Sequence, residues 1–181
     1  DPVVIASHLV VALQTIVSRT ADPIESLVVT VTKFHAGDAY NIIPEQAEIA
    51  GTVRTLKKEV AALARERIHA ICAGLGASFG AEIMVDYDAN YPVTFNHDEE
   101  TAIAADVAAE IAGPGRVETD VAPVMGGEDF SYMLEARPGA FIFMGNGDTA
   151  NLHHHAYDFN DEAIPHGMSY WIRLAETILA A

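Results

Sequence analysis

The chain has 181 residues, half of them apolar, which is typical of one ordinary domain or two small ones and excludes wholesale disorder. Ten basic against 26 acidic residues give a net charge of −16, so we expect neither nucleic acid nor an anionic membrane as a partner. The single cysteine excludes an internal disulfide framework and a cysteine-rich zinc site. No uninterrupted apolar run reaches the roughly 18 residues of a membrane span and no signal peptide opens the chain, so we expect a cytoplasmic protein.

The first half of the chain alternates between helical and strand patterns. Apolar residues at helical spacing predict one helix over residues 3–17 and a second from an N-cap at Thr55 to about residue 78. Alternating β-branched residues predict strands over residues 26–34, 46–54 and 81–88. One strand placed before Asp1 would complete a ferredoxin-like layer. Because the sequence begins inside a helical pattern without methionine, we expect a piece of a longer chain.

The pattern changes near residue 95, where we place a domain boundary. Asn96 and Glu99 have the spacing of a capping box, which predicts a helix from this point to Gly113. Further predicted elements are a short strand over residues 116–119, a short helix after Phe130, an apolar strand buried on both faces over residues 139–145, and a final helix over residues 162–179.

Three consecutive histidines, His153, His154 and His155, occupy a loop that also contains carboxylates. Neutral imidazole is the commonest metal ligand in proteins, but a solvated polar loop would have the same composition. Adjacent residues rarely point at one ion, so at most one of the three is expected to bind a metal. Most ligands of such a site would then come from elsewhere.

Two glycines, Gly126 and Gly127, precede the acidic pair Glu128 and Asp129 at the start of the short helix. Backbone N–H groups exposed by glycines can hold a carboxylate or an oxyanion. The alternative interpretation is structural, with the two acids balancing the helix dipole.

The loop between the first two predicted strands contributes His35 and Asn41, and the second strand ends near Arg54. Arginine is suited to bidentate capture of a carboxylate, and asparagine can donate to and accept from an amide. The alternatives remain open, since asparagine is common in turns and a surface arginine is usually only solvated.

Two other candidate residues have no expected role in a site. Cys72 lies on an apolar helical stripe and is expected in the core. Ser131 lacks the context of a serine hydrolase.

Three strings together resemble one family. They are the segment from Phe34 to Pro44 with Gly51-Thr-Val-Arg54, the segment from Pro123 to Tyr132, and Leu152-His153 with the segment from Tyr157 to Asp161. They are similar to the metal-dependent amidohydrolases that include hippurate hydrolase, N-acyl-amino-acid hydrolases and plant indole-acetyl-amino-acid hydrolases. The resemblance covers essentially the whole chain.

The resemblance implies an α+β lid, ferredoxin-like with its first strand missing, over residues 1–95. It implies the C-terminal α/β part of a two-metal catalytic domain over residues 96–181. His153 matches a metal ligand, whereas the other ligands and the general base are expected upstream of this chain. His155 stands where relatives often have proline.

By position, the resemblance makes Asn41, Arg54 and, more weakly, His35 substrate-binding residues of the lid, often reaching across a dimer. It gives Gly126 and Gly127 the role of meeting the substrate carboxylate. It also implies two divalent ions, zinc or manganese with cobalt or nickel possible, a small N-acyl amino acid as substrate, and a homodimer formed through the lid.

The function expected for the parent protein is therefore hydrolysis of the amide bond of N-acyl or N-aroyl amino acids. The alternative is that this chain is a non-catalytic dimerising or binding fragment, because most of the ligand set is absent from its sequence.

Overall fold

The computed structural model describes residues 1–179, and the chain divides into two compact units. Unit 1 comprises Asp1–Val93 together with Pro123–Gly127. Unit 2 comprises Thr94–Ala122 and the residues from Glu128 onward. The short segment Pro123–Gly127 therefore belongs to a different unit from the residues on either side of it.

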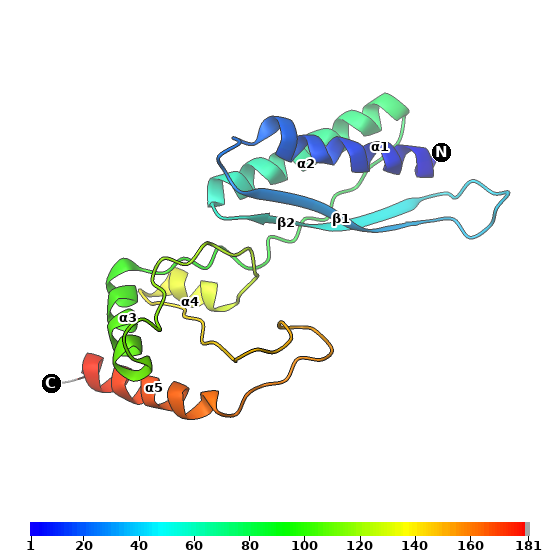
Figure 1. Cartoon of the computed structure of the whole chain (residues 1–181). Coiled ribbons are helices and arrows are strands. Elements are labelled where there is room, and N and C mark those ends of the chain that lie inside the picture. Colours follow the sequence, from blue (N-terminus) through cyan, green and yellow to red (C-terminus); the bar gives the residue numbers. More distant parts are fainter. Residues whose placement is uncertain (180–181) are drawn as a thin grey trace. The chain divides into compact units, whose positions relative to one another are not determined.

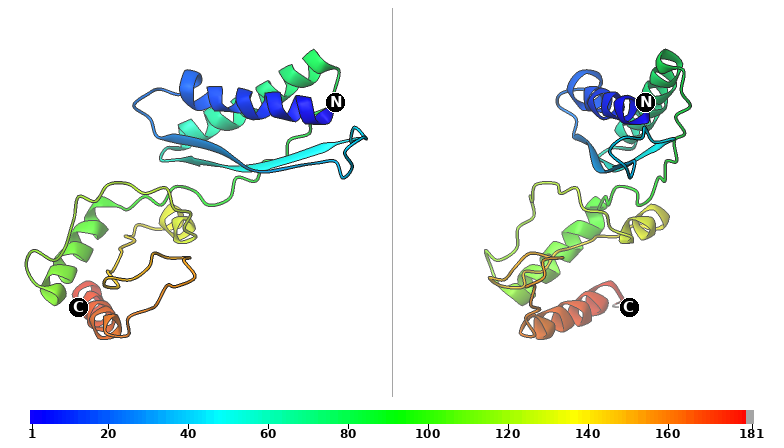
Figure 2. Two further views of the ribbon diagram at one scale, coloured as in Figure 1. Left: turned by 45° about the vertical axis from the view of Figure 1, so that its right-hand side comes forward. Right: turned by 90° about the vertical axis from the view of Figure 1, so that its right-hand side faces the viewer.

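Unit 1 consists of two helices on one face of a two-stranded antiparallel sheet (Figures 1 and 2). Helix α1 (Pro2–Thr15) begins at Asp1, whose Oδ1 accepts a hydrogen bond from the Val3 N–H at 2.9 Å. A π-helical turn, η1 (Ile16–Thr20), continues it before the turn at Asp22. The helix predicted over residues 3–17 is confirmed.

By length and composition alone, the stretch Pro2–Thr20 could cross a membrane, since it has 19 residues with a mean hydropathy of 1.5. Within unit 1, Leu9, Leu13 and Ile16 of this stretch are buried against the sheet and the second helix, whereas Val4 and Val11 are exposed.

The sheet is a long hairpin of β1 (Leu27–Ala36) and β2 (Ala47–Thr55), and both strands predicted from the alternating patterns are confirmed. The register runs from Leu27 opposite Thr55 to Ala36 opposite Ala47, with a bulge between Val31 and Lys33. The backbones approach closely beside the bulge, because a Cβ atom at Gly51 would lie 2.0 Å from the Thr30 carbonyl oxygen.

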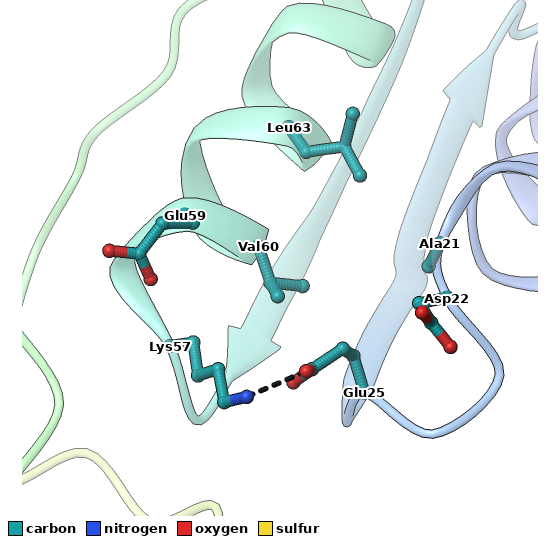
Figure 3. A pocket seen from close by; sticks show the side chains of 7 residues that line it. All are labelled: Ala21, Asp22, Glu25, Lys57, Glu59, Val60 and Leu63. Carbon is teal, nitrogen blue, oxygen red and sulfur yellow. Dashed lines mark hydrogen bonds and ion pairs between the residues drawn. The ribbon is translucent and has the colours of Figure 1, made fainter.

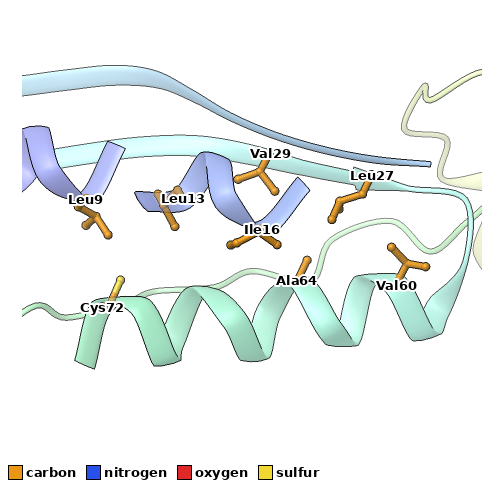
Figure 4. Close-up of a cluster of buried hydrophobic side chains, with 8 residues drawn as sticks. All are labelled: Leu9, Leu13, Ile16, Leu27, Val29, Val60, Ala64 and Cys72. Atoms are coloured by element: carbon orange, nitrogen blue, oxygen red, sulfur yellow. The ribbon is translucent and has the colours of Figure 1, made fainter. Parts of the chain in front are cut away.

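The core of unit 1 lies between the sheet and the helices (Figure 4). Its buried side chains come from α1 and η1, from the inner face of β1, and from helix α2 (Lys58–Phe79). They are Leu9, Leu13, Ile16, Leu27, Val29, Val60, Ala64 and Cys72. The predicted core position of Cys72 is confirmed.

The predicted N-cap at Thr55 is wrong. Thr55 is the last residue of β2, and its hydroxyl donates to the Lys57 carbonyl at 3.1 Å. The helix begins at Lys58, with Lys57 in the N-cap position. The strand ladder extends to Thr55 and delays the first helical turn. At the other end Gly80 closes α2 in the left-handed conformation (φ 64°).

The predicted strand over residues 81–88 is also wrong. The segment alternates between half-buried and exposed residues, and Ile83 and Val85 pack against the core. It forms no ladder, however, since the only sheet among residues 1–179 contains β1 and β2. Alternation of apolar and polar residues shows which face of an extended segment is buried. A β-strand also needs a neighbouring backbone to form its hydrogen bonds. The ferredoxin-like layer therefore stays a prediction.

Unit 2 contains helices α3 (Asp98–Ala112), α4 (Phe130–Ala136) and α5 (Ala163–Leu179), all three of them predicted. Helices α3 and α5 pack against each other, and Arg173 Nε on α5 lies 2.7 Å from Glu110 Oε2 on α3. The predicted strands over residues 116–119 and 139–145 are absent from the described chain. Residues 139–145 are not buried on both faces either, since Phe143 is 70% exposed.

The predicted capping box at Asn96 and Glu99 is wrong as well. Helix α3 begins at Asp98 with His97 in the N-cap position and no side-chain cap. The Asn96 amide instead pairs with the backbone of Phe141, with Nδ2 donating to its carbonyl and Oδ1 accepting from its N–H, both at 2.8 Å. The backbone of the 139–145 segment thus outcompetes the helix terminus for this side chain.

Candidate functional site

Arg54 and the glycine pair come together in unit 1. Arg54 lies near the end of β2, opposite Val28, and its Nη1 donates a hydrogen bond to the carbonyl of Met125. Gly126 and Gly127 follow Met125 directly. Three of the residues assigned to substrate binding by the resemblance therefore lie in one place, although 71 positions separate Arg54 from Met125.

The charge of Arg54 is available to a ligand. The side chain is exposed, and no ion pair in the described part of the chain involves it. A guanidinium carries five N–H donors in a planar fork, so the bond to Met125 leaves donors free. An exposed, uncompensated guanidinium beside backbone N–H groups is suited to a small carboxylate.

Tyr91 forms the other support of this segment. A Cβ atom at Gly127 would lie 3.2 Å from Cδ2 of the Tyr91 ring, whereas one at Gly126 would meet no atom within 4 Å. A side chain at position 127 would therefore require the Tyr91 ring to shift by a few tenths of an ångström, whereas Gly126 leaves space above the backbone. Sequence reasoning missed Tyr91, because an aromatic residue near a predicted domain boundary carries no sign of its distant partner.

The first of the two acids that follow the glycines has a local role. Glu128 Oε1 accepts from the Phe130 N–H at 3.1 Å, and the Glu128 carbonyl accepts from the Ser131 hydroxyl at 2.6 Å, so Glu128 holds the start of α4. Asp129 is the N-cap residue, but its side chain makes no capping bond, and the expectation that the acidic pair balances the helix dipole stays a prediction. Ser131 is fully buried, which explains its presence without a catalytic role.

His35 and Asn41 lie at the opposite end of the hairpin from Arg54. His35 pairs with Glu48 next to the loop, whereas Arg54 pairs with Val28, seven residues earlier on β1. At about 3.3 Å per residue the two ladder positions are roughly 20 Å apart. No side-chain hydrogen bond within residues 1–179 joins His35 or Asn41 to Arg54, so one copy of the hairpin does not bring the three to one small ligand.

A hollow of about 510 Å³ lies beside His35 at the base of the hairpin loop. Its polar lining is mainly acidic, with Asp38, Glu45 and Glu48 facing the single imidazole. Asn41 is not among the lining residues. The acidic lining is unsuited to a substrate carboxylate, which makes Arg54 the stronger of the lid candidates.

A second hollow, of about 370 Å³, lies where α2 begins (Figure 3). Lys57 Nζ and Glu25 Oε1 lie 2.6 Å apart across it, and this hydrogen bond with Glu25 raises the pKa of Lys57. Because the pair joins the turn before β1 to the start of α2 and both groups are partly exposed, we assign it a structural role.

The three histidines of the loop after residue 145 differ in their surroundings. His154 Nδ1 accepts from the Ala156 N–H at 3.1 Å, and its ring centroid lies 4.3 Å from that of His155. His153 is exposed, has no side-chain hydrogen bond among the described residues, and adopts the left-handed conformation (φ 66°). Of the three, His153 alone has neither a side-chain hydrogen bond nor a ring contact among the described residues, and the expectation of at most one metal ligand stays a prediction.

His153 fits a metal site only as a single donor. Within residues 1–179 there is no group of three His, Cys, Asp or Glu side chains placed to hold an ion. A tetrahedral or larger coordination shell needs at least three protein ligands. The donors on this chain are therefore insufficient by themselves, and the assignment of His153 stays a prediction.

The fold and these motifs match one family of enzymes. Residues 4–177 match the model of peptidase family M20/M25/M40, and the chain belongs to this family. Its α/β architecture, a small antiparallel sheet with helices, is that of family members. The expected resemblance to metal-dependent amidohydrolases is confirmed.

Individual relatives are similar over nearly the whole chain. Hippurate hydrolase of Campylobacter jejuni is 41% identical over 175 residues, which is 97% of this chain and 46% of that protein. N-acetyldiaminopimelate deacetylase of Bacillus cytotoxicus is 37% identical over 94% of this chain and 45% of its own length. A dinuclear metal-binding peptidase of the M20 family from Bacillus subtilis superposes with a TM-score of 0.80 at 31% identity, covering 100% of this chain and 46% of that one. The chain spans about half the length of the curated relatives it matches.

Proposed function

We propose that this chain forms part of a metal-dependent hydrolase that cleaves the amide bond of N-acyl or N-aroyl amino acids such as hippurate. The observation that carries the proposal is the exposed Arg54 guanidinium beside Met125, Gly126 and Gly127. A free amino-acid carboxylate is a feature shared by all substrates of this class, and a guanidinium next to backbone N–H groups binds carboxylates well. The similarity to a hippurate hydrolase supports the same class of substrate.

In this proposal residues 1–95 are the greater part of a ferredoxin-like lid that pairs two copies of the protein. Residues 96–181 are the C-terminal part of the catalytic domain. The roughly 20 Å between the ladder positions of His35 and Arg54 favours a dimer, since Asn41 and His35 of one copy would then serve the site of the other.

His153 would supply one ligand of a two-ion site, since the similar Bacillus subtilis protein is described as a dinuclear metal-binding peptidase. Zinc or manganese, or alternatively cobalt or nickel, would polarise the amide carbonyl and lower the pKa of a bound water. The other ligands and the general base would come from the part of the relatives' length that this chain does not span. The chain's own contribution is to hold the substrate carboxylate with Arg54 and the glycine segment.

The test is expression of the protein from its full gene with manganese or zinc, followed by assay of hippurate and a panel of N-acetyl amino acids. We expect amide cleavage, and we expect His153→Ala to lose metal and activity together. His154→Ala is the matched control and should be mild, because His154 is engaged within its own loop. A metal-loaded protein that cleaves no member of the panel would count against the proposal.

One observation favours a second candidate function, a non-catalytic dimerising or binding fragment. The described residues provide no three-donor metal cluster. Calorimetry of residues 1–181 with zinc separates the two. Tight stoichiometric binding of two ions by this chain alone would exclude the second candidate.

A further inference from the structure

Asn146 closes the loop that carries the three histidines. Its Nδ2 donates to the Asp158 carbonyl, and its Oδ1 accepts from the Asn160 N–H, both at 2.8 Å. Within residues 1–179 these are the only hydrogen bonds that join the two ends of this loop. The other bonds lie inside it, such as that from the His154 N–H to the Asn151 carbonyl at 3.1 Å.

We call these two hydrogen bonds of Asn146 the clasp. The residues on both sides of the clasp are anchored to α5. The Asn160 Oδ1 accepts from the Glu162 N–H at 3.0 Å, and the Asn160 carbonyl accepts from the Ala163 N–H at 2.9 Å, so Asn160 holds the first turn of the helix. On the other side, a Cβ atom at Gly167 of α5 would lie 3.5 Å from Cε of Met144. The segment that precedes Asn146 therefore contacts α5 at this point. The clasp therefore ties the loop to a helix rather than to another loop.

His153 lies at the midpoint of the closed loop, seven residues from Asn146 and seven from Asn160. It is also the only non-glycine residue with positive φ within the described chain. Such a conformation is held by the surrounding structure rather than by the residue itself. Among the hydrogen bonds of residues 1–179, those of Asn146 are the ones that fix the two ends of this loop to each other.

We propose that Asn146 is a positioning residue for His153. By fixing the span of the loop, its amide holds His153 in the left-handed conformation and thereby sets the direction of the imidazole. The effect on metal binding rests on the proposed function. The closure of the loop by Asn146 does not depend on it.

Asn96 provides a matched control. Its amide also makes two 2.8 Å hydrogen bonds to the backbone, in the same unit, but these hold Phe141 and do not involve the histidine loop. Asn146→Ala and Asn96→Ala remove the same groups, so a general loss of stability would affect both variants alike. Asn146→Asp keeps the acceptor for the Asn160 N–H and replaces the donor to the Asp158 carbonyl with a carboxylate oxygen, which repels that carbonyl.

Two measurements on the protein expressed from its full gene test the proposal. In hydrogen exchange, Asn146→Ala should lose protection in residues 147–157 by about tenfold, the factor that corresponds to the net contribution of one hydrogen bond. Zinc affinity, measured by competition with a chelator, should fall by roughly tenfold or more, as for other residues that orient metal ligands. Asn146→Asp should also lose loop protection and zinc affinity, and Asn96→Ala should be unchanged in both.

Unchanged loop protection in both Asn146 variants would overturn the clasp. A loosened loop with unaltered zinc affinity would overturn the positioning role while the clasp stands. If His153→Ala leaves zinc affinity unaltered, the metal assignment in the proposed function is wrong, and hydrogen exchange still decides the clasp. Should Asn146→Ala fail to fold, Asn146→Asp decides both questions, because it keeps one of the two bonds.

Discussion

Arg54 donates a hydrogen bond to the carbonyl of Met125, across 71 positions of sequence. The contact fixes the glycine segment on unit 1 and orients a cation next to it. It also means that Arg54 has two separable roles, one through its charge and one through its N–H group on Met125.

Substitution of Arg54 tests both roles. With hippurate as substrate we expect Arg54→Ala to raise KM by roughly tenfold to a hundredfold, because a charge-assisted hydrogen bond to the carboxylate is lost. Arg54→Lys should recover part of this loss, since lysine keeps the charge but not the planar fork. Arg19→Ala, at an exposed arginine of η1, is the control. Equal kinetics for Arg54→Ala and Arg19→Ala would contradict a role in carboxylate binding.

The two glycines of the segment should respond differently to alanine. A methyl group at position 127 meets the Tyr91 ring at 3.2 Å, so we expect Gly127→Ala to lower the free energy of unfolding by about 1 kcal/mol and to reduce activity. Gly126→Ala meets nothing within 4 Å and should be neutral in stability. Thermal unfolding of the pair measures the difference. Identical melting temperatures would mean that Tyr91 does not hold the segment.

Gly51 should tolerate no side chain. A Cβ atom there would lie 2.0 Å from the Thr30 carbonyl oxygen, and backbone cannot move aside as a flexible side chain would. We expect Gly51→Ala to cost at least about 3 kcal/mol of stability in urea unfolding. Gly74→Ala, in the middle of α2 with no atom within 4 Å, should instead stabilise by about 0.5 to 1 kcal/mol. A stable Gly51→Ala variant would require a different pairing at the bulge.

Cys72 gives unit 1 a pH dependence. Burial raises the pKa of its thiol, so the folded protein keeps the proton at a pH where the unfolded chain has lost it. Stability from this group is therefore present below the ordinary thiol pKa and decreases as the pH rises above it. We expect the urea midpoint to fall as the pH rises above the ordinary thiol pKa of about 8.5, and Cys72→Ala to flatten this decrease.

Two tyrosines add a further decrease in stability at higher pH. Burial also raises the pKa of Tyr87 and of Tyr170, so both add the same trend above about pH 10.

A thiol reagent provides an independent check of Cys72, since its thiol should react only after unfolding. Rapid modification of the native protein at pH 8 would show that the thiol is not enclosed.

The helices were predictable because the spacing of apolar residues within each one shows which face is buried. The spacing of Leu9, Leu13 and Ile16 predicts the buried face of α1 without knowledge of its neighbours. The two strands of the hairpin were predictable for the same reason, although their pairing was not. Residues 81–88 and 139–145 have equally clear patterns but no ladder among the described residues, because pairing depends on a second backbone that periodicity cannot report.

The site was predictable only in part. Arg54, the glycine pair and His153 came from strings that resemble a family, while the partners that orient them, Met125 and Tyr91, had no local signal. Asn96 shows the same limit, since its spacing to Glu99 fits a helix cap but the Phe141 backbone binds it instead. Contacts between residues distant in sequence decide which of several local options a polar side chain takes.

The assignment of Pro123–Gly127 to unit 1 has a practical consequence for anyone dissecting the molecule. The polypeptide changes unit three times, after residues 93, 122 and 127, so no single cut separates the two halves cleanly. Expression of residues 1–93 alone would leave the guanidinium of β2 without its carbonyl acceptor and expose one side of the Tyr91 ring. A shortened version meant to retain ligand affinity would need residues 123–127 grafted back through a linker.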